Sequence, residues 1–166
     1  MDLNQVMSNS TRDQFNDLLR SEGLNAGIIP VSNIPNEESR LNEVNRLGIL
    51  NRDLDQEAQY NALTQLAAII TKSQIGLINI LGSNIQQCKT NFGFNLVEST
   101  LKEELPREIS ICQYSLASPQ EPLIINDLFL DERTKHFKKL EAYENLRFYA
   151  GSPLISSRGF PLERCV

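Results

Sequence analysis

Apolar residues recur at helical spacing in the first part of the chain, after a polar stretch up to residue 35. Asn36 precedes two glutamates, as is typical of a helix N-cap, and apolar positions continue the pattern over 37–50. A second pattern, over 55–72, begins at a pair that resembles a capping box and carries a wide apolar stripe. The sequence predicts two helices, the second largely buried, after an N-terminal extension at residues 1–35.

Short apolar runs bounded by turn residues follow, which is typical of strands. The run Ile75–Leu81 ends in Gly-Ser-Asn and predicts a central strand that turns into a hairpin with residues 85–92. Further strands are expected over 123–125 and 148–155, with a bulge or an unpaired edge position at Pro153. The chain ends in a strand after the next turn.

A short third helix is expected after Pro106, with apolar residues at helical spacing up to Leu116. Two leading helices, a hairpin, short helices and further strands together indicate an α+β domain with one antiparallel sheet. The length of 166 residues suits one domain, and 40% hydrophobic with 22% charged residues suits a globular core.

Charge and hydropathy narrow the possible partners. The net charge of −5 would repel a nucleic acid unless cationic residues were clustered on the surface. The best candidate for such a cluster, at 135–139, is flanked by acidic residues, which predicts a solvated surface of mixed charge. The apolar runs fall far short of the ~20 residues of a membrane span. With no signal sequence visible, we expect a cytoplasmic protein without a nucleic-acid or membrane partner.

The residues that commonly bind metals or haem are few. Cys88, Cys112 and Cys165 are widely spaced and form no CxxC pair, which fits reduced thiols and predicts no metal site. The single histidine, His136, lies in the charged segment, where a solvated ring is expected in place of a haem ligand.

Five short phrases follow one another between Asn36 and Val166. They read NEESRL with IL, LAAII with the strand at 75–81, PREISIC, DL with DER, and RFYAGSPL. In this order they resemble the GAF domain, a small-molecule-sensing module of signalling proteins, over residues 36–166. The resemblance implies a central antiparallel sheet flanked by helices on both faces.

The closing phrase departs from the GAF pattern, since Glu163 stands where glycine is usual and the sequence stops at Val166. In the family this strand lies in the middle of the sheet and leads to a final helix. We therefore expect the last strand to be incomplete and the domain to be truncated at its C-terminus, as a piece of a longer signalling protein or a truncated gene product.

The resemblance also implies a pocket on one face of the sheet, beneath the short third helix and the loops at 127–145. Each candidate residue also has a purely structural role open to it: Phe148 and Tyr149 alternate on a strand, so one belongs to the core, and Asp131 with Arg133 can pin a loop. The candidate ligand-binding residues are Phe92, Cys112, Tyr114, Asp127, Asp131, Arg133, Phe148 and Tyr149. The ligand and any cofactor stay unknown.

By resemblance, the chain is a sensory domain of a bacterial signalling protein, either in a two-component system, such as a histidine kinase, or in a cyclic-dinucleotide enzyme. We expect that the chain itself is not an enzyme and that any kinase or cyclase activity lies outside it. The family implies a homodimer through the helices at 37–50 and 55–72. Two alternatives stay open: a thiol-based free methionine sulfoxide reductase acting through Cys112, and a dimerisation module without a ligand.

Overall fold

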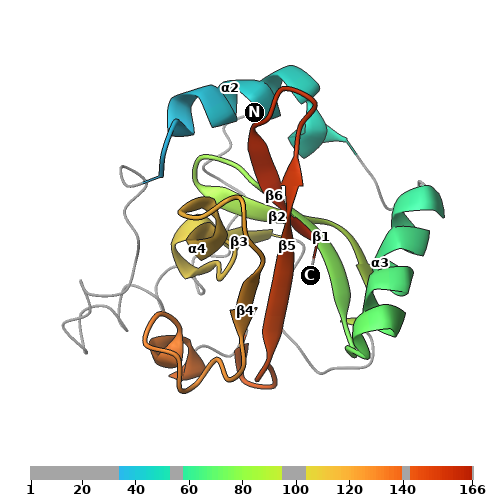
Figure 1. Ribbon diagram of the computed structural model, residues 1–166, viewed down its shortest axis with the longest axis vertical. Coiled ribbons are helices and arrows are strands. Elements are labelled where there is room, and N and C mark those ends of the chain that lie inside the picture. The colour runs from blue at the N-terminus through green and yellow to red at the C-terminus, as the bar shows by residue number, and fades with distance from the viewer. Residues whose placement is uncertain (1–33, 53–57, 95–103, 140–142, 166) are drawn as a thin grey trace.

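The computed structural model describes residues 34–52, 58–94, 104–139 and 143–165, which form an α+β domain (Figure 1). Within these residues a six-stranded sheet has the order β3-β2-β1-β6-β5-β4, and its neighbouring strands are antiparallel. The strands are β1 (Gly76–Leu81), β2 (Ile85–Phe92), β3 (Glu104–Pro106), β4 (Leu123–Ile125), β5 (Tyr149–Ile155) and β6 (Pro161–Cys165). The helices are α2 (Glu37–Leu47), α3 (Ala58–Thr71) and α4 (Gln113–Leu116), with 3-10 turns η3 (Ile49–Asn51), η5 (Arg107–Ile109) and η6 (Lys135–Lys139). The predicted fold class is confirmed.

Strand β1 is central, as predicted, and pairs with β2 from Gly76↔Phe92 to Leu81↔Gln86. On its other side it meets β6. Strand β5 changes partner along its length: residues 149–151 pair with β4, and residues 152–155 pair with β6. Strand β5 therefore connects the edge strand β4 to β6 in the middle of the sheet.

The two faces of the sheet bury separate apolar clusters, because successive side chains of a strand point to opposite faces. Ile80 of β1 packs with Val44 of α2 and Leu162 of β6. Leu81, the next residue, belongs to the larger cluster that includes residues of η5, α4 and β5. In Figure 1, α3 stands on one side of the strands and α4 on the other, with α2 across their upper end.

The first predicted helix ends early. Gly48 adopts the left-handed conformation at φ 61°, which terminates α2 at Leu47, and a 3-10 turn follows. The expected side-chain cap by Asn36 is wrong: this residue is itself left-handed, and its side chain makes no capping hydrogen bond. Its backbone carbonyl instead accepts a hydrogen bond from the Arg40 N–H at 2.9 Å.

The expectation that the second helix is largely buried is also wrong. Helix α3 buries Thr64 and Ala68, whereas four large apolar side chains on it are 51–70% exposed: Leu63, Leu66, Ile69 and Ile70. The small residues face the sheet because the helix lies very close to β1, where a Cβ atom on Gly76 would come within 2.3 Å of the Thr64 carbonyl oxygen. The apolar stripe therefore faces away from the sheet.

The stretch from Pro106 to Leu116 was predicted as one helix, and the structure divides it. Pro106 ends β3 instead of starting a helix, and the extended Ser110 separates η5 from α4. Strand β3 lies in a stretch for which no strand was predicted, and it pairs with β2. Pro153 is neither unpaired nor at an edge, because it lies opposite Arg164; the irregularity falls between Leu154 and Ile155.

The charged segment at 135–139 is not simply a solvated surface. Phe137 is buried and its ring stacks on Tyr143 at a centroid distance of 5.3 Å. His136, expected to be solvated, is buried too, with its ring 4.2 Å from that of Phe137. The tight 3-10 turn sends successive side chains to different sides, so Lys135 and Lys138 stay exposed.

A buried ionic cluster joins α2 to η5. Arg40 and Arg107 are almost fully buried and share the carboxylate of Glu37, at 2.7 Å from Arg40 Nε to Oε2 and 2.5 Å from Arg107 Nη1 to Oε1. The guanidinium groups also donate to the carbonyls of Leu81 and Gly82 at 2.8 and 2.7 Å. These contacts fix the segment that leads into α4.

Among the residues described here, no helix has the combination of length and apolar character required to cross a bilayer.

Candidate ligand-binding pocket

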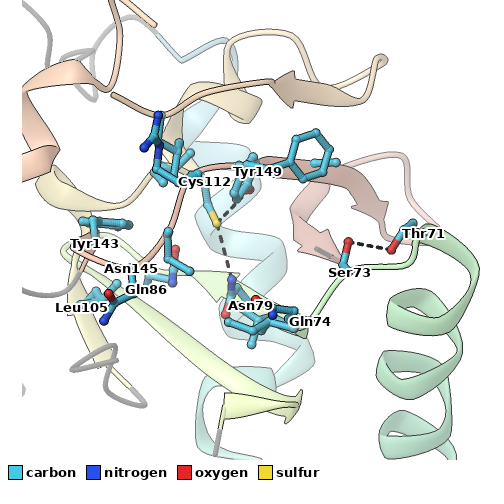
Figure 2. Close-up of a pocket in the computed structure, with 18 of the residues that line it drawn as sticks. Thr71, Ser73, Gln74, Asn79, Gln86, Leu105, Cys112, Tyr143, Asn145 and Tyr149 are labelled. Atoms are coloured by element: carbon cyan, nitrogen blue, oxygen red, sulfur yellow. Dashed lines mark hydrogen bonds between the residues drawn. The ribbon is translucent and has the colours of Figure 1, made fainter. Parts of the chain in front are cut away.

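A cavity of about 440 Å³ lies against the face of the sheet that carries Leu81. It is enclosed by β1, the start of α4, the segment leading into β5 and the C-terminal end of α3 (Figure 2). The lining residues are 71–75, Leu77, Asn79, Gln86, Leu105, Ile111, Cys112, Leu128, Tyr143 and 145–150.

Three polar side chains from three different elements meet in the cavity wall. Asn79 Nδ2 in β1 donates a hydrogen bond to the sulfur of Cys112 at 3.5 Å, and this sulfur lies 3.3 Å from the hydroxyl oxygen of Tyr149 in β5. Figure 2 shows these groups together, with Cys112 between the other two. All three residues are buried, so we call Asn79, Cys112 and Tyr149 the polar floor.

One atom of the polar floor lacks a partner. Asn79 Oδ1 is buried and accepts no hydrogen bond in the structure. A buried acceptor without a donor costs on the order of 1–3 kcal/mol, so native proteins seldom keep one without a reason. Asn79 is also one of the residues that line the cavity.

Other polar groups of the cavity wall have partners within the protein. The Gln86 side-chain oxygen accepts a hydrogen bond from the Ser110 hydroxyl, and the Tyr143 hydroxyl donates to the carbonyl of Ile109 at 2.6 Å. Burial raises the pKa of Tyr143 well above its ordinary value, so the phenol is neutral. These bonds hold the wall beside η5 in place.

Among the described lining residues, the charged ones are Lys72 and Arg147, which are both cations and both exposed. Arg147 binds the carboxylate of Asp127 through two hydrogen bonds, and its guanidinium lies 4.9 Å from the centre of the Phe129 ring. The hydrogen bond from Arg147 lowers the pKa of Asp127, which keeps the pair ionised. The cavity thus has a neutral floor, and its rim carries Lys72 and the Arg147–Asp127 ion pair.

Cys112, Phe148 and Tyr149 are the predicted site residues that line the cavity. Tyr149 is buried in the polar floor, whereas its neighbour Phe148 is exposed at the rim. Phe148 immediately precedes β5, of which Tyr149 is the first residue.

The other predicted residues are not among those that line the cavity. Phe92 ends β2. The Tyr114 hydroxyl donates to the carbonyl of Arg133 at 2.7 Å, and burial raises the pKa of Tyr114 to about 12. Asp131 pairs with Arg133 at 2.6 Å and also accepts the Arg133 backbone N–H, and these bonds lower the pKa of Asp131.

Asp127 accepts the backbone N–H of Phe129 in addition to its pair with Arg147. The contacts of Asp127, Asp131 and Arg133 are therefore those of residues that shape the loops beside the cavity.

Sequence reasoning missed Asn79, Gln86 and the end of α3 as lining segments. Asn79 carried a usable signal, because it is the one polar residue in the apolar run Ile75–Leu81 of a central strand. A polar residue there needs a partner, since both faces of the sheet are covered.

The described residues include no group of three or more His, Cys, Asp or Glu side chains placed to hold a metal ion. A cavity with apolar walls and a few directed polar groups is instead typical of a site that binds a small organic molecule.

Comparison with known proteins places the chain near bacterial second-messenger signalling. No family model matches it. Over 126 residues it is 27% identical to a cyclic di-GMP phosphodiesterase of Pseudomonas aeruginosa, a match that covers 76% of this chain and 20% of that protein. The chain has a distant relative in cyclic di-GMP signalling. It spans about a fifth of that relative's length.

This comparison corrects one expectation from the sequence. The chain was expected not to be an enzyme, but the relative that it matches is named as one, a phosphodiesterase. A role in signalling is supported at the level of this distant relationship.

Proposed function

We propose that the chain is a GAF-like sensory domain of a bacterial protein in cyclic di-GMP signalling, and that its signal is a small molecule bound in the cavity. The observation that carries this proposal is the cavity of about 440 Å³ with apolar walls and a polar floor on the central sheet. The α+β fold and the distant relationship to a cyclic di-GMP phosphodiesterase support it.

The position of the cavity suggests how binding changes the rest of the domain. Thr71, the last residue of α3, and residues 72–74 directly after it line the cavity together with Cys112, the residue before α4. A ligand that contacts these residues favours the packing of α3 that suits it best, and so shifts the population of conformers.

The domain pairs with a second copy through α3. The exposed stripe of Leu63, Leu66, Ile69 and Ile70 gives this helix an apolar outer face. The sequence of α3 contains no charged residue, so two copies can approach without like-charge repulsion along the helix. The helix that contacts the ligand is then also the helix that contacts the partner.

A thermal-shift screen against soluble bacterial metabolites tests the sensory function. Compounds that bind raise the melting temperature of the 166-residue chain, by several degrees when present at about 100 times their Kd. Leu77→Trp, which fills part of the cavity, abolishes these shifts. Leu130→Trp, a matched change at a 75% exposed position outside the lining, preserves them.

Two outcomes contradict the proposal: a screen without any stabilising compound, or shifts that are equally large in Leu77→Trp.

A further inference from the structure

The unpartnered oxygen of Asn79 indicates which chemical class of ligand the cavity takes. Asn79 is 2% exposed, and its Nδ2 is already engaged with the sulfur of Cys112. The remaining atom, Oδ1, can only accept a hydrogen bond. A ligand seated against this amide satisfies it by supplying an N–H or O–H donor.

The surroundings of the polar floor restrict the rest of the ligand. Leu77, Leu105, Ile111 and Leu128 present apolar surface, which favours a largely apolar body. Among the lining residues that the structure describes, none is a carboxylate, whereas Lys72 and Arg147 are cations. Arg147 is already paired with Asp127, so among the described lining residues a cationic ligand would find no counter-ion, whereas an anionic group would find Lys72 at the rim.

On these grounds, and resting on the sensory function proposed above, we infer that the ligand is a largely apolar, uncharged or anionic small molecule that donates a hydrogen bond to Asn79 Oδ1. Asn79 is then the specificity-determining residue of the cavity.

Three probes of nearly equal size separate the contributions of donor and charge. Indole-3-acetate has a ring N–H donor and a carboxylate. Benzofuran-3-acetate replaces this N–H by an oxygen that can only accept, and tryptamine keeps the N–H but carries a positive charge. Their Kd values for the 166-residue chain are measured by isothermal titration calorimetry.

We expect indole-3-acetate to bind at least about tenfold more tightly than benzofuran-3-acetate. Benzofuran-3-acetate leaves Asn79 Oδ1 without a donor and places its own ring oxygen, a second acceptor, beside it. Tryptamine is expected to bind more weakly than indole-3-acetate as well. In Asn79→Leu, the difference between the two acetates falls to within about twofold. In the control Asn91→Leu, on β2 outside the lining, the difference is retained.

Equal or tighter binding of benzofuran-3-acetate to the unmodified chain overturns the inference, and this comparison stands even if Asn79→Leu does not fold. Failure of all three probes to bind overturns the ligand class as well. Neither result removes the proposed sensory function, which fails only if the metabolite screen finds no cavity ligand. A screen whose cavity ligands all lack a donor retains the function and contradicts the inference.

Discussion

Buried polar residues in this domain fall into two kinds, according to what their hydrogen bonds hold together. Arg40 and Arg107 donate to backbone carbonyls at the end of β1, and Tyr143 donates to the carbonyl of Ile109, so these side chains stabilise the turns around the cavity. Asn79 binds only another side chain in the cavity wall, and its unpaired Oδ1 belongs to a residue of the lining, unlike the unpaired Nε and Nη2 of Arg107. The first kind serves the fold, and the second is available to a ligand.

The buried ionic cluster makes a direct prediction about stability. Glu37→Gln removes the carboxylate shared by Arg40 and Arg107 and leaves two guanidinium groups buried without a counter-charge, which we expect to lower the free energy of unfolding by about 3 kcal/mol. Urea denaturation followed by circular dichroism measures this loss.

The neighbouring Glu38→Gln is the matched control, because Glu38 is exposed, and it is expected to change stability little. A loss no larger in Glu37→Gln than in Glu38→Gln would contradict the role given to the cluster.

His136 predicts how stability depends on pH. Burial lowers the pKa of His136 below its ordinary 6.5, and the nearby charge of Lys135 adds to this effect. Below about pH 6.5 the unfolded chain therefore binds a proton that the folded chain does not, so stability falls as the pH is lowered until the folded pKa is reached.

In His136→Gln, the melting temperature is expected to fall less between pH 7 and 5.5 than in the unmodified chain. Identical pH profiles for the two proteins would show that His136 does not titrate in this way.

At the residue scale, the sequence revealed the chemistry of side chains but not their surroundings. Its prediction of a solvated His136 was wrong because charged neighbours hide the burial of alternate residues in a 3-10 turn. Asp131 and Arg133 were correctly considered as a loop-pinning pair, since that contact is local in sequence. Asn79 and Cys112 are far apart in the chain, and a single sequence does not show that two such residues are in contact in the fold.

Among the secondary-structure elements, the central hairpin was predicted most accurately. Alternation and turn residues are local signals, so β1 and β2 were placed within one residue of their observed bounds. Strand β3 was missed because its three residues pair only through tertiary contact with β2. The apolar stripe of α3 was recognised, but its direction was not, because the close approach of Gly76 and Thr64 decides which face meets the sheet.

The outward direction of this stripe predicts self-association. We expect the chain to sediment as a dimer at tens of micromolar concentration, and Leu66→Glu to shift it to monomer, because burying a charge in an apolar helix pair is unfavourable. Analytical ultracentrifugation measures the change.

Leu130→Glu, at another exposed apolar position, is the control and is expected to leave the dimer intact. A monomer in the unmodified chain, or a dimer that persists in Leu66→Glu, would exclude α3 as the interface.

In the whole molecule, the cavity lies where segments distant in sequence meet. Residues 71–75 of the α3–β1 junction, Cys112 before α4 and Tyr149 of β5 all line it. The resemblance led to Cys112 and Tyr149 because their phrases are distinctive, whereas the contribution of α3 depends on how the helix packs and could not be predicted. The same packing connects the cavity to the exposed face of α3, which is the basis of the proposed signal transmission.

The central claim is that a small molecule bound in this cavity changes the packing of α3. The most direct test is a ¹H–¹⁵N NMR titration of the 166-residue chain with the strongest binder from the thermal-shift screen. We expect the largest chemical-shift changes on Asn79, Cys112, Tyr149 and residues 71–74, with smaller changes along α3. Changes confined to the opposite face of the sheet, around Val44 and Leu162, would contradict it.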